Sequence, residues 1–371
     1  MNNDLLPKNL TGYWNQFDSR DLYWIKSIGE LGIDHVYFAL DMPQRAGIYS
    51  RLDELPRDQP LIISFHVEYF WQHDLLRWFR SRPNQKILLL SDWHTYDNFW
   101  PSNVTVCRWI TWHHQLARII NTYGMCRPRT EPPSRKFSSL AGRHEWHRAA
   151  ITALLLSRLP PQDLVLSWQD IRFDKNLYYL RDDQYLDPMI AKLVRSEWFR
   201  NLAPIHSLVN RGSGSPLDHA NWNHPAYLDC AVNFTNESIF NSCTMIDQKF
   251  FHLPGPYLTE KTWKPLLACQ AFVPVGQRGT VNTLEDLGLR FTWLRRLNFS
   301  EQPADQDRMV AIMRFVLSIK DIECDDLWAL SQPDAQANLD WIHSGEFARQ
   351  CDQANQSVLH QIDQWLVDGA Q

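Results

Sequence analysis

The chain has 371 residues, of which 44% are hydrophobic and 21% charged, so it is long enough for two domains and is typical of a folded protein. Its formal net charge of −5 makes the molecule as a whole a poor electrostatic match for a nucleic-acid backbone. The seventeen Trp residues supply large surfaces for burial or for stacking on sugars and bases.

Seven cysteines are scattered without a C-x-x-C pair, which favours reduced thiols over a disulfide framework or a zinc site. The first residues lack the basic stretch and apolar run of a signal peptide. No apolar run approaches the roughly 20 residues needed to span a bilayer. We therefore expect a cytoplasmic protein without a transmembrane segment.

In the first third of the chain, near-continuous apolar runs alternate with amphipathic stretches. Such runs are typical of parallel strands that are covered on both faces. The predicted strands are 35–40, 61–70, 86–92 and 104–110, and the predicted helices are 19–31 and 73–82. This alternation predicts an α/β fold with a doubly wound parallel sheet.

A Pro-, Arg- and Ser-rich segment, 127–135, interrupts this alternation and is typical of a linker. The pattern then restarts, with predicted strands 136–141, 164–168 and 229–236 and predicted helices 144–159, 188–202, 305–319 and 354–369. We predict two Rossmann-like lobes with a cleft between them. The predicted parts are lobe 1–126, linker 127–135, lobe 136–300, and C-terminal helices over 301–371 that pack on the lobes.

The segment GPYLTEKTWKP places a polar cluster, from Thr259 to Thr262, directly before a helical run. Pro265 cannot lie deep inside a helix, because it lacks an N–H and clashes with the preceding turn, so the helix is predicted to begin near Lys261 or Thr262. A Lys at a helix N-terminus suits an anion such as phosphate, and Glu260 beside it can hold neighbouring hydroxyls. The alternative is an ordinary helix start with a first-turn Glu and a solvated Lys.

Two further segments carry candidate residues at predicted strand ends, where ligands bind in parallel sheets. Residues 127–148 include six Arg or Lys and two Glu, and Arg143 and Arg148 lie at and just inside a helix start. Arg suits two-pronged binding of phosphate, although a solvated basic linker is the alternative. In NFTNES, Asn236 and Glu237 follow another strand, where Asn and Thr also serve as ordinary caps.

Several familiar motifs are missing from the sequence. It contains no Walker loop, G-x-G-x-x-G, H-E-x-x-H or G-x-S-x-G, which weakens ATPase, dehydrogenase, zincin and α/β-hydrolase interpretations. It also contains no D-x-D between apolar strands, which weakens a metal-dependent nucleotide-sugar site. We therefore expect no metal and no cofactor.

In combination, KFSSLAGRHEWHRAAITALLL, VNFTNES and YLTEKTWKPLLACQAFVPVG resemble the donor-site region of the α-1,3-fucosyltransferase-like glycosyltransferases. TEKTWKP and the downstream LEDLGLRF are similar to phage and bacterial relatives of that family. The resemblance covers roughly residues 136–295. It implies a GT-B fold and metal-independent, inverting transfer from a nucleotide-diphosphate sugar. Carried over by motif, it implies that Lys261 and Arg148 neutralise the diphosphate, Glu260 contacts hydroxyls, and Tyr257 and Asn236 line the pocket.

An inverting transferase also needs a base for the acceptor hydroxyl. Glu68 and Asp92 lie near the ends of predicted strands of the first lobe and Asp41 follows another, although most such carboxylates cap the next helix. The leading hypothesis is a glycosyltransferase acting on a glycan or small-molecule acceptor. The alternatives are a catalytically inactive binding or scaffold protein, and a phage-type DNA-base glycosyltransferase with a basic groove on the first lobe.

Overall fold

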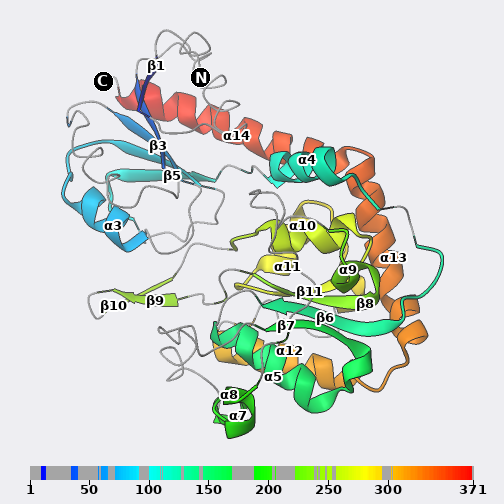
Figure 1. Ribbon diagram of the computed structural model, residues 1–371. Coiled ribbons are helices and arrows are strands. Elements are labelled where there is room, and N and C mark those ends of the chain that lie inside the picture. The colour runs from blue at the N-terminus through cyan, green and yellow to red at the C-terminus, as the bar shows by residue number, and fades with distance from the viewer. Residues whose placement is uncertain are drawn as a thin grey trace. The chain divides into compact units, whose positions relative to one another are not determined.

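The computed structural model describes residues 10–13, 35–40, 57, 60–65, 72–91, 100–108, 110, 112–126, 129–141, 145–168, 188–202, 205, 222–237, 240, 243–246, 249–252, 256–294, 302 and 304–369. These residues form an α/β protein with parallel sheets (Figure 1). Contacts divide the chain into two compact units. Unit 1 comprises residues 1–114, 243–255 and 348–371, and unit 2 comprises residues 115–242 and 256–347.

Unit 1 contains a five-stranded sheet in the order β1-β2-β3-β4-β5, with every neighbouring pair parallel. Its strands are β1 Leu10–Tyr13, β2 His35–Leu40, β3 Leu61–Phe65, β4 Ile87–Ser91 and β5 Val104–Arg108, and α3 spans Gln72–Arg80. Leu76 and Phe79 of α3 are fully buried, as are residues 87–90 of β4. An apolar helix face therefore covers an apolar strand, as in a doubly wound sheet.

The last part of α14 (Glu346–Gly369) also belongs to unit 1. The fully buried Asn355 side chain accepts a hydrogen bond from the Ile110 amide and donates one to the Ile110 carbonyl, both at 2.9 Å. This pair satisfies main-chain groups just after β5, where the ladder of the sheet has ended. An antiparallel pair, β9 Cys243–Ile246 and β10 Lys249–His252, completes the described elements of this unit.

Unit 2 contains a four-stranded parallel sheet in the order β11-β8-β6-β7. Its strands are β6 Arg135–Ala141, β7 Leu164–Trp168, β8 Cys230–Asn236 and β11 Ala271–Val275. Every residue of β8 and β11 is buried. This is the pattern of a parallel sheet covered on both faces, and the polar side chains buried in β8, Asn233, Thr235 and Asn236, form hydrogen bonds with one another or with β6.

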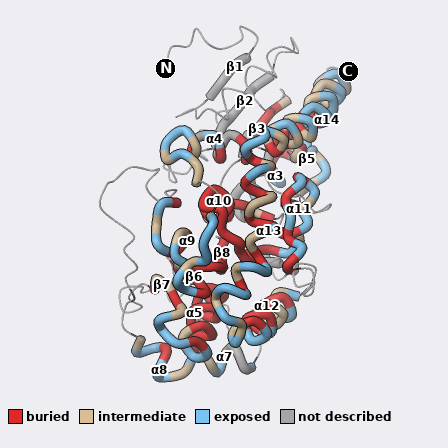
Figure 2. The backbone as a smooth tube through the Cα atoms, turned by 90° about the vertical axis from the view of Figure 1, so that its right-hand side faces the viewer, coloured by how far each residue is buried: buried red, intermediate tan, exposed pale blue. Residues whose placement is uncertain are grey.

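Helices lie on both faces of the unit 2 sheet (Figure 1). One face carries α5 Trp146–Arg158 and α12 Asp305–Ile319, and the other carries α9 Pro225–Leu228, α10 Glu260–Leu267 and α13 Cys324–His343. Figure 2 shows the buried residues concentrated along α5, β8 and α10. The remaining helical elements are α4 Trp112–Tyr123, η3 Pro161–Asp163, α7 Pro188–Val194, α8 Glu197–Arg200, α11 Thr280–Asp286 and η7 Thr292–Leu294.

The predicted α/β class is confirmed, and several predicted elements match closely. The strands at 35–40 and 164–168 and the helix at 305–319 have the predicted bounds. The strand predicted from residue 136 begins at Arg135, inside the segment predicted as a linker, and contacts place the whole of 127–135 within unit 2. The predicted helix 19–31 lies outside the described residues.

Two helical predictions differ from the structure. The helix predicted over 188–202 is divided into α7 and α8, because Ser196 takes an extended conformation and its hydroxyl caps α8 by accepting from the Phe199 amide at 3.3 Å. The prediction also missed α13, whose buried face includes Asp334 and Asn338. Asp334 accepts from Thr292 at 2.7 Å, so this polar side chain is buried only because a distant segment pairs with it.

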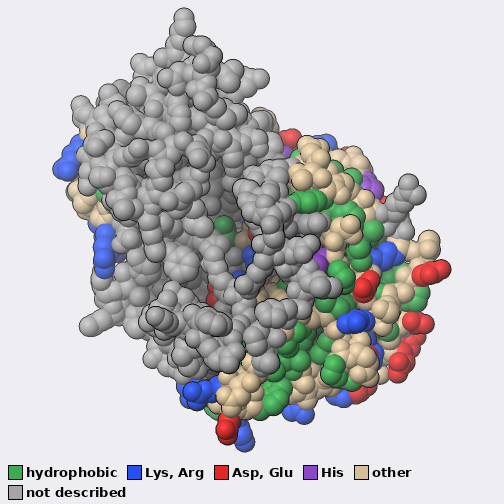
Figure 3. Space-filling model, in the orientation of Figure 1, with side chains coloured by type: hydrophobic (Ala, Val, Ile, Leu, Met, Phe, Trp, Pro, Cys, Tyr) green, Lys and Arg blue, Asp and Glu red, His purple; other side chains and the backbone are tan. Residues whose placement is uncertain are grey.

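The described surface of unit 2 visible in Figure 3 mixes acidic, basic and hydrophobic side chains. A surface of this kind differs from the continuous basic surface that binds a nucleic-acid backbone. No helix in the described part of the chain is long and apolar enough to cross a membrane.

Gly288 provides a test of this packing, because it follows α11 with φ +86° and an added Cβ would lie 2.5 Å from the Trp341 ring. We expect Gly288→Ala to lower the free energy of unfolding by about 2–5 kcal/mol, combining left-handed strain with overpacking. The matched control is Gly345→Ala, at φ +77° with nothing within 4 Å of the added Cβ, which should cost about 1–2 kcal/mol. Urea denaturation measures both, and equal losses would contradict the close approach of Trp341.

Candidate functional site

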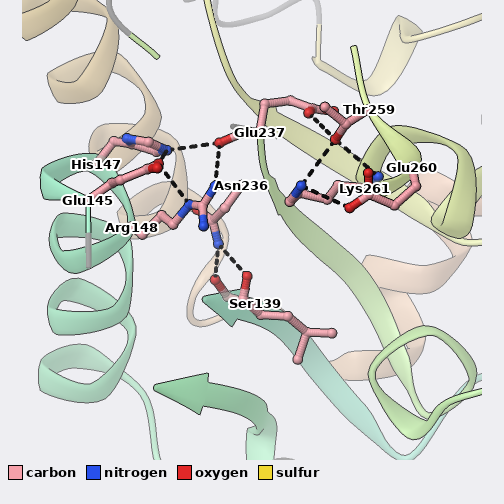
Figure 4. A network of polar contacts seen from close by, with 10 residues as sticks. Ser139, Glu145, His147, Arg148, Asn236, Glu237, Thr259, Glu260 and Lys261 are labelled. Carbon is pink, nitrogen blue, oxygen red and sulfur yellow. Dashed lines mark hydrogen bonds and ion pairs between the residues drawn. The ribbon is translucent and has the colours of Figure 1, made fainter. Parts of the chain in front are cut away.

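A polar cluster lies at the carboxyl edge of the unit 2 sheet, where β8 ends and where α5 and α10 begin (Figure 4). Thr259, Glu260 and Lys261 approach from the start of α10, while Arg148 approaches from the start of α5. Glu237, the residue after β8, lies between the two groups. Parallel sheets bind ligands at this edge, because strand ends and helix N-termini meet there.

The start of α10 is capped by Thr259, whose hydroxyl accepts a hydrogen bond from the Lys261 amide at 3.3 Å. The helix begins at Glu260, one residue before the earliest predicted start, and Pro265 lies inside it. Lys261 Nζ donates to Glu260 Oε1 at 2.9 Å and to Thr259 Oγ1 at 3.3 Å. The side chains of Lys261 and Glu260 are 25% and 24% exposed, so both are accessible to a ligand.

Arg148 lies on the α5 side of the cluster and is 3% exposed. Its Nη2 donates to the Glu237 carbonyl at 3.1 Å, and its Nε lies 3.1 Å from Glu145 Oε2. A buried cation needs such partners, because an unpaired buried charge is strongly destabilising. Arg148 is therefore a buried cation fixed by protein partners, whereas the Lys261 side chain is one quarter exposed.

His147 donates from Nε2 to the same Glu237 carbonyl at 3.1 Å, since a carbonyl can only accept. Burial lowers the pKa of His147 well below its ordinary value, and the nearby Arg148 charge lowers it further. His147 is therefore neutral and adds no charge to the cluster. Its ring stacks on Phe240 with centroids 5.3 Å apart and planes 16° apart.

The Glu237 side chain is fully buried, and its carboxyl oxygens bind the hydroxyls of Thr259, at 2.6 Å, and Thr262. Burial raises the pKa of this carboxyl, while the Lys261 charge and the two hydroxyl contacts oppose the shift. The side chain that we predicted to contact a donor thus binds the first turn of α10 instead.

Asn236 and Tyr257 are also brought to this edge. Asn236 Nδ2 donates to Ser139 Oγ at 2.8 Å, while its buried Oδ1 lacks a hydrogen-bond partner among the described residues. The Tyr257 amide donates to Gln277 Oε1 at 2.9 Å, which ties the segment before α10 to the turn after β11. Arg143, Glu68, Asp92 and Asp41 lie outside the described residues.

Three cations of the basic segment 127–148 bind the protein itself. Arg129 donates to the Tyr227 carbonyl, and Arg135 donates to the Leu164 carbonyl at 2.9 Å. Lys136 pairs with Asp163 at 3.4 Å. These contacts anchor the chain around β6, and phosphate binding by the segment stays a prediction.

Sequence reasoning missed Arg308, which is 1% exposed on α12. It donates to the Gly276 carbonyl at 3.1 Å and to the Phe240 carbonyl, and it pairs with Asp305 at 2.8 Å. Its guanidinium carbon also lies 4.3 Å from the centroid of the Phe240 ring, and the same ring stacks against His147. A signal was present, because Arg308 interrupts an apolar stripe that continues at Ile312.

Among the described residues, no group of three or more His, Cys, Asp or Glu side chains is arranged to hold a metal ion. Comparison of the chain with protein-family models, curated proteins and solved structures gives no match. The chemistry of the site therefore has to be argued from its own residues.

Replacing Arg308 tests whether α12 holds the ends of β8 and β11. We expect Arg308→Met to lower the free energy of unfolding by about 3–5 kcal/mol, because two carbonyls lose their donor and Asp305 loses its partner. Lys320→Met, which removes an exposed pair with Asp321 at the end of the same helix, should cost no more than about 0.5 kcal/mol. Chemical denaturation compares the two, and a loss below about 1 kcal/mol for Arg308→Met would exclude this role.

Proposed function

We propose that this protein is a glycosyltransferase of GT-B architecture that moves a sugar from a nucleotide-diphosphate sugar to a hydroxyl acceptor. The observation that carries the proposal is the pairing of Lys261 and Glu260 at the N-terminus of α10, on the carboxyl edge of a parallel sheet. Arg148 on the facing helix supplies a second cation near Glu237. The expected reaction is inverting and needs neither a metal nor a cofactor.

The chemistry follows from the charge that develops during transfer. When the bond between the sugar and the diphosphate breaks, negative charge grows on the leaving diphosphate, and fixed cations and helix N–H groups stabilise it. Lys261 at the start of α10 offers such a cation without a metal, and the N-terminal end of the helix adds positive potential. In the cell the acceptor is a glycan or a small molecule, and a nucleotide sugar is the donor.

Lys261 is hydrogen-bonded to Glu260, and we propose that a bound diphosphate takes the place of that carboxylate. The exchange releases Glu260 oxygens, which then accept hydrogen bonds from hydroxyls of the ribose or the sugar. One rearrangement thus directs the cation to the phosphate and the carboxylate to the hydroxyls. Both side chains are about one quarter exposed, so the desolvation cost of this rearrangement is low.

The acceptor hydroxyl needs a base, and Glu68 and Asp92 are the proposed candidates because each lies near the end of a predicted strand of the first lobe. Neither takes part in the contacts described above, since both lie outside the described residues. The proposal for the donor site is therefore independent of which carboxylate acts as the base.

A binding protein without catalysis is the second candidate, and one observation favours it. Both cations of the cluster have an adjacent carboxylate, Glu145 for Arg148 and Glu260 for Lys261, so the site is electrostatically balanced without a ligand. Such a site could bind a nucleotide sugar and leave it intact. A DNA-base glycosyltransferase is a further alternative, and it would require a basic groove on unit 1.

The test is a screen of nucleotide sugars for hydrolysis and transfer, combined with titration calorimetry against UDP and GDP. We expect Lys261→Ala and Glu260→Ala each to lower turnover about 10²-fold or more, because each removes a group that acts on the transition state. Lys192→Ala, at an exposed position of α7, is the matched control and should retain wild-type turnover.

Three outcomes separate the candidates. Wild-type turnover in both the Lys261 and the Glu260 variants would remove the glycosyltransferase proposal. Binding of UDP or GDP without hydrolysis or transfer of any nucleotide sugar would favour the binding protein. Thermal unfolding of each variant serves as the control for folding.

A further inference from the structure

Glu237 occupies a position that its role as a predicted donor contact does not explain. Its side chain is 0% exposed, although the neighbouring side chains of Lys261 and Glu260 are about one quarter exposed. A carboxyl group is rarely buried this completely unless its oxygens are bound. Both oxygens are bound here, to the hydroxyls of Thr259 and Thr262.

The two threonines define the first turn of α10. Thr259 is its N-cap and Thr262 is the third residue of the helix. Because the Thr259 hydroxyl donates its hydrogen to Glu237, its lone pairs face the Lys261 amide and the Lys261 ammonium group, both at 3.3 Å. The carboxyl of Glu237 thus orients the hydroxyl that holds Lys261.

The main chain of Glu237 serves the opposite side of the site. Its carbonyl accepts from His147 and from Arg148, each at 3.1 Å. Its amide donates to the Val275 carbonyl at 3.0 Å, which extends the pairing of β8 with β11 by one residue. A single residue therefore connects the sheet edge, the α5 cation and the α10 cap.

Glu237 also packs beside Gly276, at the turn after β11. A Cβ added to Gly276 would lie 3.4 Å from Cβ and Cγ of Glu237 and 3.1 Å from Thr280 Oγ1. The Gly276 carbonyl is in turn bound by Arg308. The Glu237 side chain is thus enclosed by the protein and is not exposed to a ligand.

We propose that Glu237 is the positioning residue of the site, which sets the distance and orientation of Lys261 and Arg148 by binding the α10 cap with its carboxyl group and the α5 cation with its carbonyl. The placement of these groups stands on the geometry alone. Its consequence for nucleotide binding rests on the proposed function.

The charge of this carboxyl matters for an anion site. The charged or titratable groups around it include Lys261, Glu260 and Lys264 of α10, Tyr227 of α9, Arg148, His147 and Glu145 at the start of α5, and Arg308 of α12. Because burial raises its pKa, Glu237 stays protonated to a higher pH than an exposed carboxyl, and it then adds no negative charge beside Lys261. Anion affinity should therefore be full below the raised pKa and fall as the pH rises through it.

Hydrogen exchange of the ligand-free protein tests the placement directly. In Glu237→Leu, which keeps the volume but binds neither threonine, we expect amide exchange to rise about tenfold or more in peptides covering 256–268. Glu237→Gln can still accept from one threonine and donate to the other, so it should restore slow exchange. Peptides covering 324–343 in α13 are the internal control for global destabilisation.

The inference is overturned if exchange at the start of α10 is unchanged in Glu237→Leu, if Glu237→Gln fails to restore it, or if the α13 peptides change equally. A nucleotide enters in the second arm, which measures GDP and UDP affinity from about pH 5 to about pH 9, where buried carboxyls titrate. We expect affinity to fall more steeply with pH in the wild-type protein than in Glu237→Gln, which has no proton to lose. Equal slopes would remove the charge argument.

The two arms separate the inference from the proposed function. If the wild-type protein binds neither nucleotide at any pH while the exchange pattern holds, the proposed function fails and the positioning role stands. If nucleotides bind but the exchange pattern fails, the positioning role is lost and the donor site remains.

Discussion

The hydrogen bond from the Glu237 amide to the carbonyl of Val275, the last residue of β11, extends the pairing of the two strands one residue past the end of β8. In a parallel sheet this edge is where main-chain groups begin to lack ladder partners, so an extra pair fixes the direction in which the chain leaves. Here the Glu237 carboxyl group contacts the first turn of α10, and the Glu237 carbonyl contacts Arg148 of α5. The positions of Arg148 and Lys261 therefore depend on the direction that the chain takes at Glu237, after β8 ends.

The two cations do not have equal roles in the proposed site. Arg148 is 3% exposed and has two protein partners, so withdrawing it from Glu145 would leave a buried carboxylate oxygen and a buried guanidinium to be satisfied again. Lys261 and Glu260 are each about a quarter exposed, and water can replace their mutual contact. A ligand therefore displaces the Lys261 pair at the lower cost. Arg148 contributes a fixed field, and Lys261 contributes the direct contact.

The parts of the fold that were predictable from sequence follow from local patterns. The strands at 35–40 and 164–168 and the helix at 305–319 were predicted from hydrophobic patterns alone, and the polar cluster before Pro265 correctly indicated a helix N-terminus. The failures involve polar groups whose partners lie far away in sequence. Asp334 resembles a surface residue until Thr292 pairs with it, and Arg129 resembles a free cation until the Tyr227 carbonyl binds it.

Glu237 illustrates the same limit within the site. Glu237 belongs to a polar run that follows a strand. Such a position is equally compatible with a residue that faces a ligand and with one that is buried, since both kinds of residue follow strand ends. Glu237 is buried because the hydroxyls of Thr259 and Thr262 donate hydrogen bonds to its carboxyl oxygens.

Arg308 lies in the same packed unit as the candidate site. The sequence predicts a lobe over 136–300 with the later helices packed on it, and contacts place 256–347 in one unit with β6 and β8. By binding the Gly276 and Phe240 carbonyls, α12 satisfies main-chain groups at the ends of β11 and β8 that the sheet leaves without ladder partners. A piece cut at residue 300 would keep every motif of the proposed donor site and lose the helix that holds its strand ends in place. For this protein the site is thus defined by the packed unit, and the motif segment alone is insufficient.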